Sequence, residues 1–211
     1  MSKFFTSDSH LGHGNIIKYC NRPFLSKDEQ LRLDAGEHVR VSFESVRRMD
    51  DHLLDQINKT VGVDDTLIHL GDFCFGHRRA YYEAAQKYRA RIKCKNIIMI
   101  WGNHDQPHIK DLFSSSYDLH KTIVNNQKIV LCHYAMAIWE GSHRGTWHLY
   151  GHSHATAESN LDRMMPSRKS MDVGVDNAYK ILGEYRPFSF DEIHQVIDSR
   201  KGFSFDHHEI K

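Results

Sequence analysis

The sequence has few cysteines, few prolines and no long hydrophobic run. Its four cysteines lie far apart and form no Cys-x-x-Cys pair, so the chain encodes neither a zinc knuckle nor a dense disulfide framework. No run of about 18 apolar residues is present, and Asp8 interrupts the amino terminus before an apolar signal core could form. We therefore expect a cytoplasmic protein that is neither exported by a standard signal nor inserted in a membrane.

The sequence also has little net charge. Lys and Arg number 28 and Asp and Glu number 27 in a chain of 211 residues, so the surface as a whole does not attract nucleic acid or an anionic membrane. An anionic substrate must be attracted locally, by a site. Because there is no internal repeat and no Pro/Gly/Ser linker, we expect residues 1–211 to form a single α/β domain.

Histidine, in contrast, is abundant, at 17 residues. Imidazole is the commonest side-chain ligand of transition metals and a natural acid or base near neutral pH. The composition therefore favours metal chemistry, although it does not by itself place a metal.

Short apolar runs recur along the sequence, and each ends in a polar cluster. The runs are typical of buried strands. Because ligands bind at the carboxyl ends of the strands in open α/β sheets, we expect the clusters to share one site. The runs and clusters are 4–6 before Asp8 and His10, 66–70 before Asp72, 96–101 before Asn103, His104 and Asp105, 128–132 before His133, and 147–150 before His152 and His154.

Helices are expected between these runs. The clearest is 43–57, whose apolar residues fall on one face; residues 78–93 and 190–197 predict two more. Asn125-Asn126 between alternating runs predicts a hairpin, so parallel and antiparallel strands should occur together. Residues 22–42 carry charges without a clear period, and we interpret them as a surface excursion.

The polar clusters differ in how strongly each one indicates a functional site. Asp8-x-His10 is weak, because about 1.4 such spacings are expected by chance from this composition. Gly-His-x-His at 151–154 has a chance expectation of about 0.08, and Gly-Asn-His-Asp at 102–105 of about 0.004. Their joint occurrence after strand-like runs makes coincidence a poor explanation.

Taken together and in this order, the motifs resemble those of the calcineurin-like metallophosphoesterase superfamily, and the resemblance covers nearly the whole chain. It implies an α/β fold of two packed, mostly mixed β-sheets flanked by helices, an α/β/β/α sandwich with metals at the strand ends. Further segments resemble a small prokaryotic and phage-type branch: His10-Leu11-Gly12-His13-Gly14-Asn15-Ile16-Ile17, Asn21-Arg22-Pro23-Phe24, Trp147-His148-Leu149-Tyr150 and Val173-Gly174-Val175-Asp176.

The resemblance also implies a dinuclear metal site. The Asp72 carboxylate would bridge two divalent cations, which in such sites lie about 3.5 to 4 Å apart. The mixed nitrogen and oxygen donors suit Mn²⁺, our first expectation, with Fe, Zn²⁺, Ni²⁺, Co²⁺ or Mg²⁺ as alternatives. The other ligands implied are Asp8, His10 and His154 for one metal, and Asn103, His133 and His152 for the other.

The implied activity is hydrolysis of a phosphate ester, most readily a phosphodiester, by in-line attack of a metal-bridging hydroxide. His104 would assist the leaving group by protonating it or by stabilising charge on the phosphoryl group. Asp105 would orient His104, although it could instead cap the segment that follows.

Residues further from the motifs are weaker candidates for substrate contacts. His13, Asn15 and Arg22 follow the first motif closely enough to line the mouth of the site, although an ordinary surface loop explains them equally well. His143 and Arg144 lie in the loop before the last motif and could hold a second phosphate.

Other functions remain open. The same metal core would serve a phosphomonoesterase or nucleotidase, and the substrate could be a nucleotide or a nucleic-acid end. A binding scaffold of the same fold without catalysis is the alternative to an enzyme, but such a scaffold should show a broken ligand set. The sequence indicates no protein partner.

Overall fold

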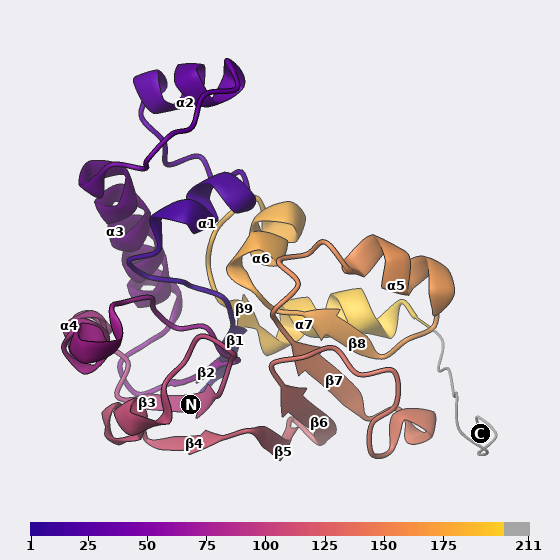
Figure 1. The fold of residues 1–211 in the computed structure, drawn as a ribbon. Helices are drawn as coiled ribbons and strands as arrows, with labels where there is room; N and C mark the ends of the chain where they lie inside the picture. The colour runs from indigo at the N-terminus through magenta and orange to yellow at the C-terminus, as the bar shows by residue number, and fades with distance from the viewer. Residues whose placement is uncertain (201–211) are drawn as a thin grey trace.

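Two packed β-sheets with helices on their outer sides make up the fold (Figure 1). The computed structural model describes residues 1–200, so residues 201–211 of the predicted domain lie outside the described residues. The first sheet has the order β4-β3-β2-β1-β9, in which β1 to β4 run parallel and β9 joins β1 antiparallel. Its strands are β1 (Lys3–Thr6), β2 (Thr66–His69), β3 (Asn96–Ile100), β4 (Ser115–Tyr117) and β9 (Phe188–Ser189).

The second sheet has the order β5-β6-β7-β8, with an antiparallel β5–β6 pair and parallel pairs beyond it. Asn125 and Asn126 join the antiparallel pair with φ values of 49° and 65°, the left-handed backbone that a two-residue hairpin turn requires. The predicted hairpin and the predicted mixed sheets are therefore confirmed. The strands are β5 (Leu119–Val124), β6 (Gln127–Cys132), β7 (Trp147–Tyr150) and β8 (Ser170–Asp172).

Helices flank both sheets, as Figure 1 shows, with α1, α3 and α4 beside the first sheet and α5 beside the second. The α-helices are α1 (Gly14–Tyr19), α2 (Lys27–Asp34), α3 (Phe43–Thr60), α4 (Tyr81–Arg91), α5 (Glu158–Met164), α6 (Val175–Leu182) and α7 (Phe190–Asp198), and the short 3-10 helices are η1 (Arg78–Ala80), η2 (Pro107–Leu112) and η3 (Ser142–Arg144). None of the helices within residues 1–200 is long and apolar enough to cross a membrane.

Helix α2 lies in the region interpreted as an irregular surface excursion, and that interpretation was incomplete. Ser26 accepts a hydrogen bond from the Glu29 amide while the Glu29 carboxylate accepts one from the Ser26 amide, which is a capping box that starts a helix. The Ser-x-x-Glu spacing is visible in the sequence. A hydrophobic period is absent because most of the helix is exposed.

Two hydrophobic cores hold the layers together. One lies between the first sheet and helices α1, α3 and α4, and includes Met49, Leu53 and Leu67. The other lies between the sheets and under α7, and includes Phe5, Leu131 and Ile193. Since the strands β2, β7 and β8 are buried throughout, their ends are fixed relative to one another, and so are the loops that follow them.

Candidate metal centre

The polar clusters predicted at the strand ends come together around one carboxylate. Oδ2 of Asp72, which follows β2, lies 3.4 Å from His10 Nε2 and 3.6 Å from His133 Nε2. One oxygen therefore stands between an imidazole delivered by the first sheet and an imidazole delivered by the second. This position suits a bridging ligand, the role that the resemblance implied for Asp72.

On one side of Asp72 stand Asp8, His10 and His154. Oδ1 of Asp8 lies 3.9 Å from His10 Nε2 and 3.9 Å from His154 Nε2. One ligand atom from each residue lies within 4.8 Å of the others. The first three predicted ligands are thus close enough together to hold one metal ion; we call them the buried half of the centre, because Asp8 and His10 are almost fully inaccessible to solvent.

On the other side stand His133, His152 and Asn103. Ligand atoms of Asp72, His133 and His152 lie within 4.8 Å of one another, and Asn103 Oδ1 is 3.1 Å from His133 Nε2. His133 donates through Nδ1 to the carbonyl of Leu70 at 2.7 Å, which leaves Nε2 as the ligand atom. Because Asn103 and His152 are exposed, we call these three residues the open half.

The donor atoms fit a divalent cation. Asp8 Oδ1 and His10 Nε2 are buried and have no hydrogen-bond partner among the described residues, a costly arrangement for polar atoms unless something else satisfies them. Imidazole nitrogens with carboxylate and amide oxygens form the set that Mn²⁺, Fe, Zn²⁺, Ni²⁺ and Co²⁺ accept. The residues present therefore fit the metal that the sequence motifs imply.

Strained backbone supports the same site. Residues other than glycine rarely adopt positive φ, and those that do are concentrated at functional sites. Five of the predicted ligands adopt it here: Asp8 at 56°, His10 at 47°, Asp72 at 56°, His152 at 67° and His154 at 48°.

Close backbone approach explains the glycines of the motifs. A Cβ atom at Gly102 would lie 2.2 Å from Asp72 Oδ1, and one at Gly151 would lie 2.3 Å from Asp8 Oδ2. Both distances are shorter than any real contact, so a side chain at either position would displace a carboxylate of the centre. The Gly-Asn-His-Asp and Gly-His-x-His motifs therefore need glycine because the backbone packs closely against these carboxylates.

Asp105 has a different role from the expected one. Its carboxylate accepts hydrogen bonds from the amides of Asp72 at 2.7 Å, Phe73 at 3.0 Å and Gly102 at 2.9 Å. It thereby ties the loop after β2 to the loop after β3. These bonds do not reach the His104 ring that Asp105 was expected to orient; the residue instead positions the backbone of Asp72.

Two further carboxylates act in a similar way and were missed. Asp172, at the end of β8, accepts hydrogen bonds from Ser153 Oγ at 2.8 Å and the Ala155 amide at 3.0 Å, so it holds the loop that carries His152 and His154. Asp176, in the first turn of α6, accepts a hydrogen bond from His154 Nδ1 at 2.7 Å, which leaves His154 Nε2 to face Asp8. Asp172 ends β8 and Asp176 lies four residues beyond it, so the strand-end pattern could have found them.

Arg22 lies inside the protein, almost fully inaccessible to solvent, instead of at the mouth of the site where it was expected. Its Nε and Nη2 atoms each donate to the Asp176 carboxylate at 2.8 Å. Its Nη2 and Nη1 atoms also donate to the carbonyls of Asp8 at 2.8 Å and Ser9 at 3.1 Å. One buried guanidinium thus braces the strained Asp8–His10 turn and the carboxylate that orients His154.

These contacts shape the charge of the buried half in the metal-free protein. Burial, the largest effect, raises the pKa of Asp8 well above its usual range. Burial alone would lower the pKa of His154, but hydrogen bonds to Asp176 and Cys20 and the charge of Asp8 outweigh it and raise this pKa to about 10. The protonated His154 therefore carries a positive charge at the position where a metal cation would bind.

His104, His13 and Asn15 lie on the accessible side. The His104 amide donates to Asp72 Oδ1 at 2.9 Å, while its exposed ring lies 5.3 Å from the His10 ring. The ring of His13 lies 5.5 Å from that of His10, and burial lowers its pKa to about 4. Asn15 is exposed on α1, and no contact links it to the ligands.

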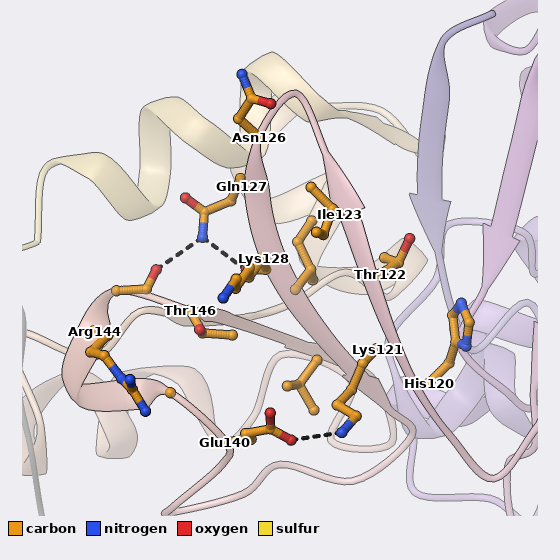
Figure 2. A pocket seen from close by; sticks show the side chains of 14 residues that line it. His120, Lys121, Thr122, Ile123, Asn126, Gln127, Lys128, Glu140, Arg144 and Thr146 are labelled. Atoms are coloured by element: carbon orange, nitrogen blue, oxygen red, sulfur yellow. Dashed lines mark hydrogen bonds and ion pairs between the residues drawn. The ribbon is translucent and has the colours of Figure 1, made fainter.

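Arg144 lines a separate groove of about 830 Å³ between the β5–β6 hairpin and the loop around η3. Figure 2 shows it there with Lys121, which pairs with Glu140 at 2.7 Å. None of the predicted metal ligands lines this groove. That Arg144 or its neighbour His143, which belongs to the same 3-10 helix, holds a second phosphate of the substrate stays a prediction.

Comparison with known proteins agrees with the fold. The uncharacterised protein MJ1445 of Methanocaldococcus jannaschii is 28% identical to this chain over 200 residues, which cover 94% of this chain and 92% of that one. The Gene 66 protein of Mycobacterium phage D29 is 30% identical over 105 residues, 50% of this chain and 41% of that protein. The crystal structure of AQ665, a protein of unknown function from Aquifex aeolicus, shares the fold with a TM-score of 0.63, at 22% identity over 93% of this chain and 99% of that one.

Two sheets deliver carboxylates and imidazoles from their strand ends to one centre, an arrangement that fits a metal-dependent phosphoesterase. The family model of the calcineurin-like phosphoesterases matches residues 2–210, and the chain belongs to that family. The predicted fold class and the predicted family are both confirmed.

Proposed function

We propose that this protein is a dinuclear metal-dependent phosphoesterase that prefers phosphodiesters. The observation that carries the proposal is the Asp72 carboxylate, one oxygen of which lies within 3.6 Å of imidazoles from both halves of the centre. The buried half would hold one cation and the open half the other. Two cations so placed would activate a water molecule and offset charge on the phosphoryl oxygens.

His104 is the residue we assign to the leaving group. Its backbone is held by Asp72, whereas its ring is exposed and lies beside the His10 ring. A ring in this place can donate a proton to a departing alkoxide that enters from the solvent side. His13 lies 6.5 Å from the His104 ring, between ring centroids, and would contact the same end of the substrate.

The preference for diesters is inferred from charge. A phosphomonoester carries about one more negative charge than a diester at neutral pH, and an enzyme for monoesters gains from an additional cation at the phosphate. The two arginines expected there lie elsewhere: Arg22 is buried and neutralised by Asp176, and Arg144 lines the separate groove. The remaining polar groups at the mouth suit a singly charged phosphate.

The test is a metal-restoration assay. The protein is stripped of metal and then assayed with bis-p-nitrophenyl phosphate and p-nitrophenyl phosphate after addition of Mn²⁺, Ni²⁺, Zn²⁺ or Mg²⁺. Asp72→Asn is compared with Asp64→Asn, a surface carboxylate paired with Lys95. We expect metal-dependent release, faster from the diester, that falls by about a thousandfold or more in Asp72→Asn and stays unchanged in Asp64→Asn.

Each result has a separate meaning. Wild-type turnover by Asp72→Asn would refute the bridging role of Asp72. Faster release from the monoester would refute the diester preference while keeping the enzyme class. Absence of release with every metal and both esters would favour the binding scaffold of the same fold.

A further inference from the structure

Aromatic side chains stand exposed around the candidate metal centre. Phe75 is 42% exposed and Tyr134 is 47% exposed. Aromatic rings are normally placed in the core, where their large apolar surface is removed from water. Single exposed aromatic side chains are common on protein surfaces, but these two both border a polar site, where a substrate would meet them.

Phe75 is held rigidly on the side of the centre where His104 stands. Its amide donates to the carbonyl of Leu11 at 2.8 Å, which ties it to the loop that carries the first ligands. The ring of His13 stacks on that of Phe75 at a centroid distance of 4.1 Å and an interplanar angle of 13°. The Phe75 ring also lies 6.1 Å from the His104 ring, so it flanks the position assigned to the leaving group.

Tyr134 flanks the opposite side. It directly follows His133, and its ring lies 4.8 Å from the His152 ring and 5.1 Å from the His133 ring. The open half is therefore bordered by an exposed aromatic ring as well. Aromatic surfaces flank the polar centre on both sides, although they come from different sheets.

The chemistry of these surroundings selects among phosphate esters. Flat aromatic faces bind flat aromatic groups, and stacking of a nucleobase on an aromatic side chain tolerates any base because each base has a π-face. The centre lacks an accessible arginine from the predicted set, since Arg22 is buried with Asp176. Recognition beyond the phosphate would thus rest on stacking more than on additional charge.

We propose that the site takes phosphate esters of nucleosides, with the nucleobase stacked on the exposed face of Phe75 and with Tyr134 contacting the opposite side of the substrate. This proposal rests on the proposed function in that the same metal centre holds the phosphate. It narrows the substrate class from phosphate esters in general to nucleotides or nucleotide ends.

The direct test is binding, which does not depend on turnover. Adenosine 5′-monophosphate carries adenine at C1′, where ribose 5-phosphate carries a hydroxyl, so the ratio of their dissociation constants on the Mn²⁺-loaded protein measures what replacing this hydroxyl by the base contributes. The ratio is determined by calorimetry for the wild type and for Phe75→Ala, Phe75→Leu and Tyr134→Ala. Phe43→Ala removes an aromatic ring that is 72% exposed at the start of α3 and serves as the control.

We expect adenosine 5′-monophosphate to bind at least about tenfold more tightly than ribose 5-phosphate, in keeping with stacking on an aromatic residue. Phe75→Ala should bring the ratio close to one, Phe75→Leu and Tyr134→Ala should lower it partly, and Phe43→Ala should leave it unchanged. Binding of ribose 5-phosphate should stay the same in all four variants.

A wild-type ratio near one would overturn the proposal, and so would a large ratio that Phe75→Ala leaves intact, because the base would then be bound elsewhere. Failure of the proposed function is distinguishable from both results. In that case the metal-restoration assay shows no release from either nitrophenyl ester, while the binding ratio still decides whether the base is recognised.

Discussion

The two halves of the candidate metal centre share Asp72 but are built differently. In the buried half, Asp8 and His10 are almost fully inaccessible, and His154 is fixed through Nδ1 by Asp176. In the open half, His133 is fixed by the Leu70 carbonyl, but Asn103 and His152 are exposed. Burial and bracing are therefore concentrated in the buried half.

The ion pair between Arg22 and Asp176 braces the buried half from two sides. Arg22 contacts the backbone of Asp8 and Ser9 on one side and Asp176 on the other. Ligands held in place before the metal arrives lose less conformational entropy when it binds. We therefore expect the buried half to bind its metal more tightly than the open half, which stays accessible to substrate.

The largest expected effect is on the rate of hydrolysis and comes from His104, the residue on the accessible side to which we assign the leaving group. His104→Ala is expected to slow hydrolysis of alkyl esters with poor leaving groups by about 10²- to 10⁴-fold, and that of nitrophenyl esters much less, because nitrophenolate needs no proton. Metal content should stay at the wild-type value. Equal slowing of both substrate types would show that proton donation is not its main function.

Arg22 should have the next largest effect, on stability. Arg22→Gln leaves Asp176 without its buried cation, a change that costs about 3 to 5 kcal/mol, measured by urea unfolding of the metal-free protein. Arg32→Gln removes an exposed pair with Glu37 and should change stability little. If the two variants unfold alike, the Arg22–Asp176 pair does not brace the fold.

Asp176 should affect the metal as well as the fold, because it orients His154 in addition to pairing with Arg22. Asp176→Asn is expected to weaken metal binding in the buried half by about 10- to 100-fold, the usual consequence of losing the carboxylate that orients a ligating histidine. Binding in the open half should change little. Asp55→Asn, an exposed carboxylate paired with Lys59, is the matched control, and an equal loss at both halves would remove the distinction between them.

The smallest expected effect, for each pH unit, comes from the proton that His154 releases when the metal binds. The pKa of His154 in the metal-free protein is raised to about 10, above its ordinary value of about 6.5, so His154 is protonated at pH 8. Metal binding to Nε2 must displace this proton, and affinity in the buried half should fall about tenfold for each pH unit between 9 and 7. Calorimetry in two buffers with different ionisation enthalpies detects the release, and identical heats in both buffers would contradict it.

The sequence was most informative where the candidate site residues directly follow a strand. The ligand clusters were predictable because each stands within a few residues of a buried run, and parallel strand ends meet at one edge. The hairpin at Asn125-Asn126 was predictable because few residues tolerate its backbone.

The positioning residues were not predictable in the same way. Arg22 looked suited to a phosphate, but the fold carries it beneath the Asp8–His10 turn, where Asp176 from a distant helix meets it. Asp105 adjoins His104 in sequence, yet its carboxylate points to the amides of another loop. Such roles depend on how loops from different strands pack, and no local pattern encodes that.

Titration of the metal-free protein with Mn²⁺ in a calorimeter tests whether the two halves of the centre bind metal with unequal affinity. The wild type, His154→Ala and His152→Ala are compared. We predict two unequal binding steps, with the tighter step lost in His154→Ala and only the weaker step reduced in His152→Ala. A single step, or equal effects of both substitutions on the same step, would contradict the division of the centre into a buried and an open half.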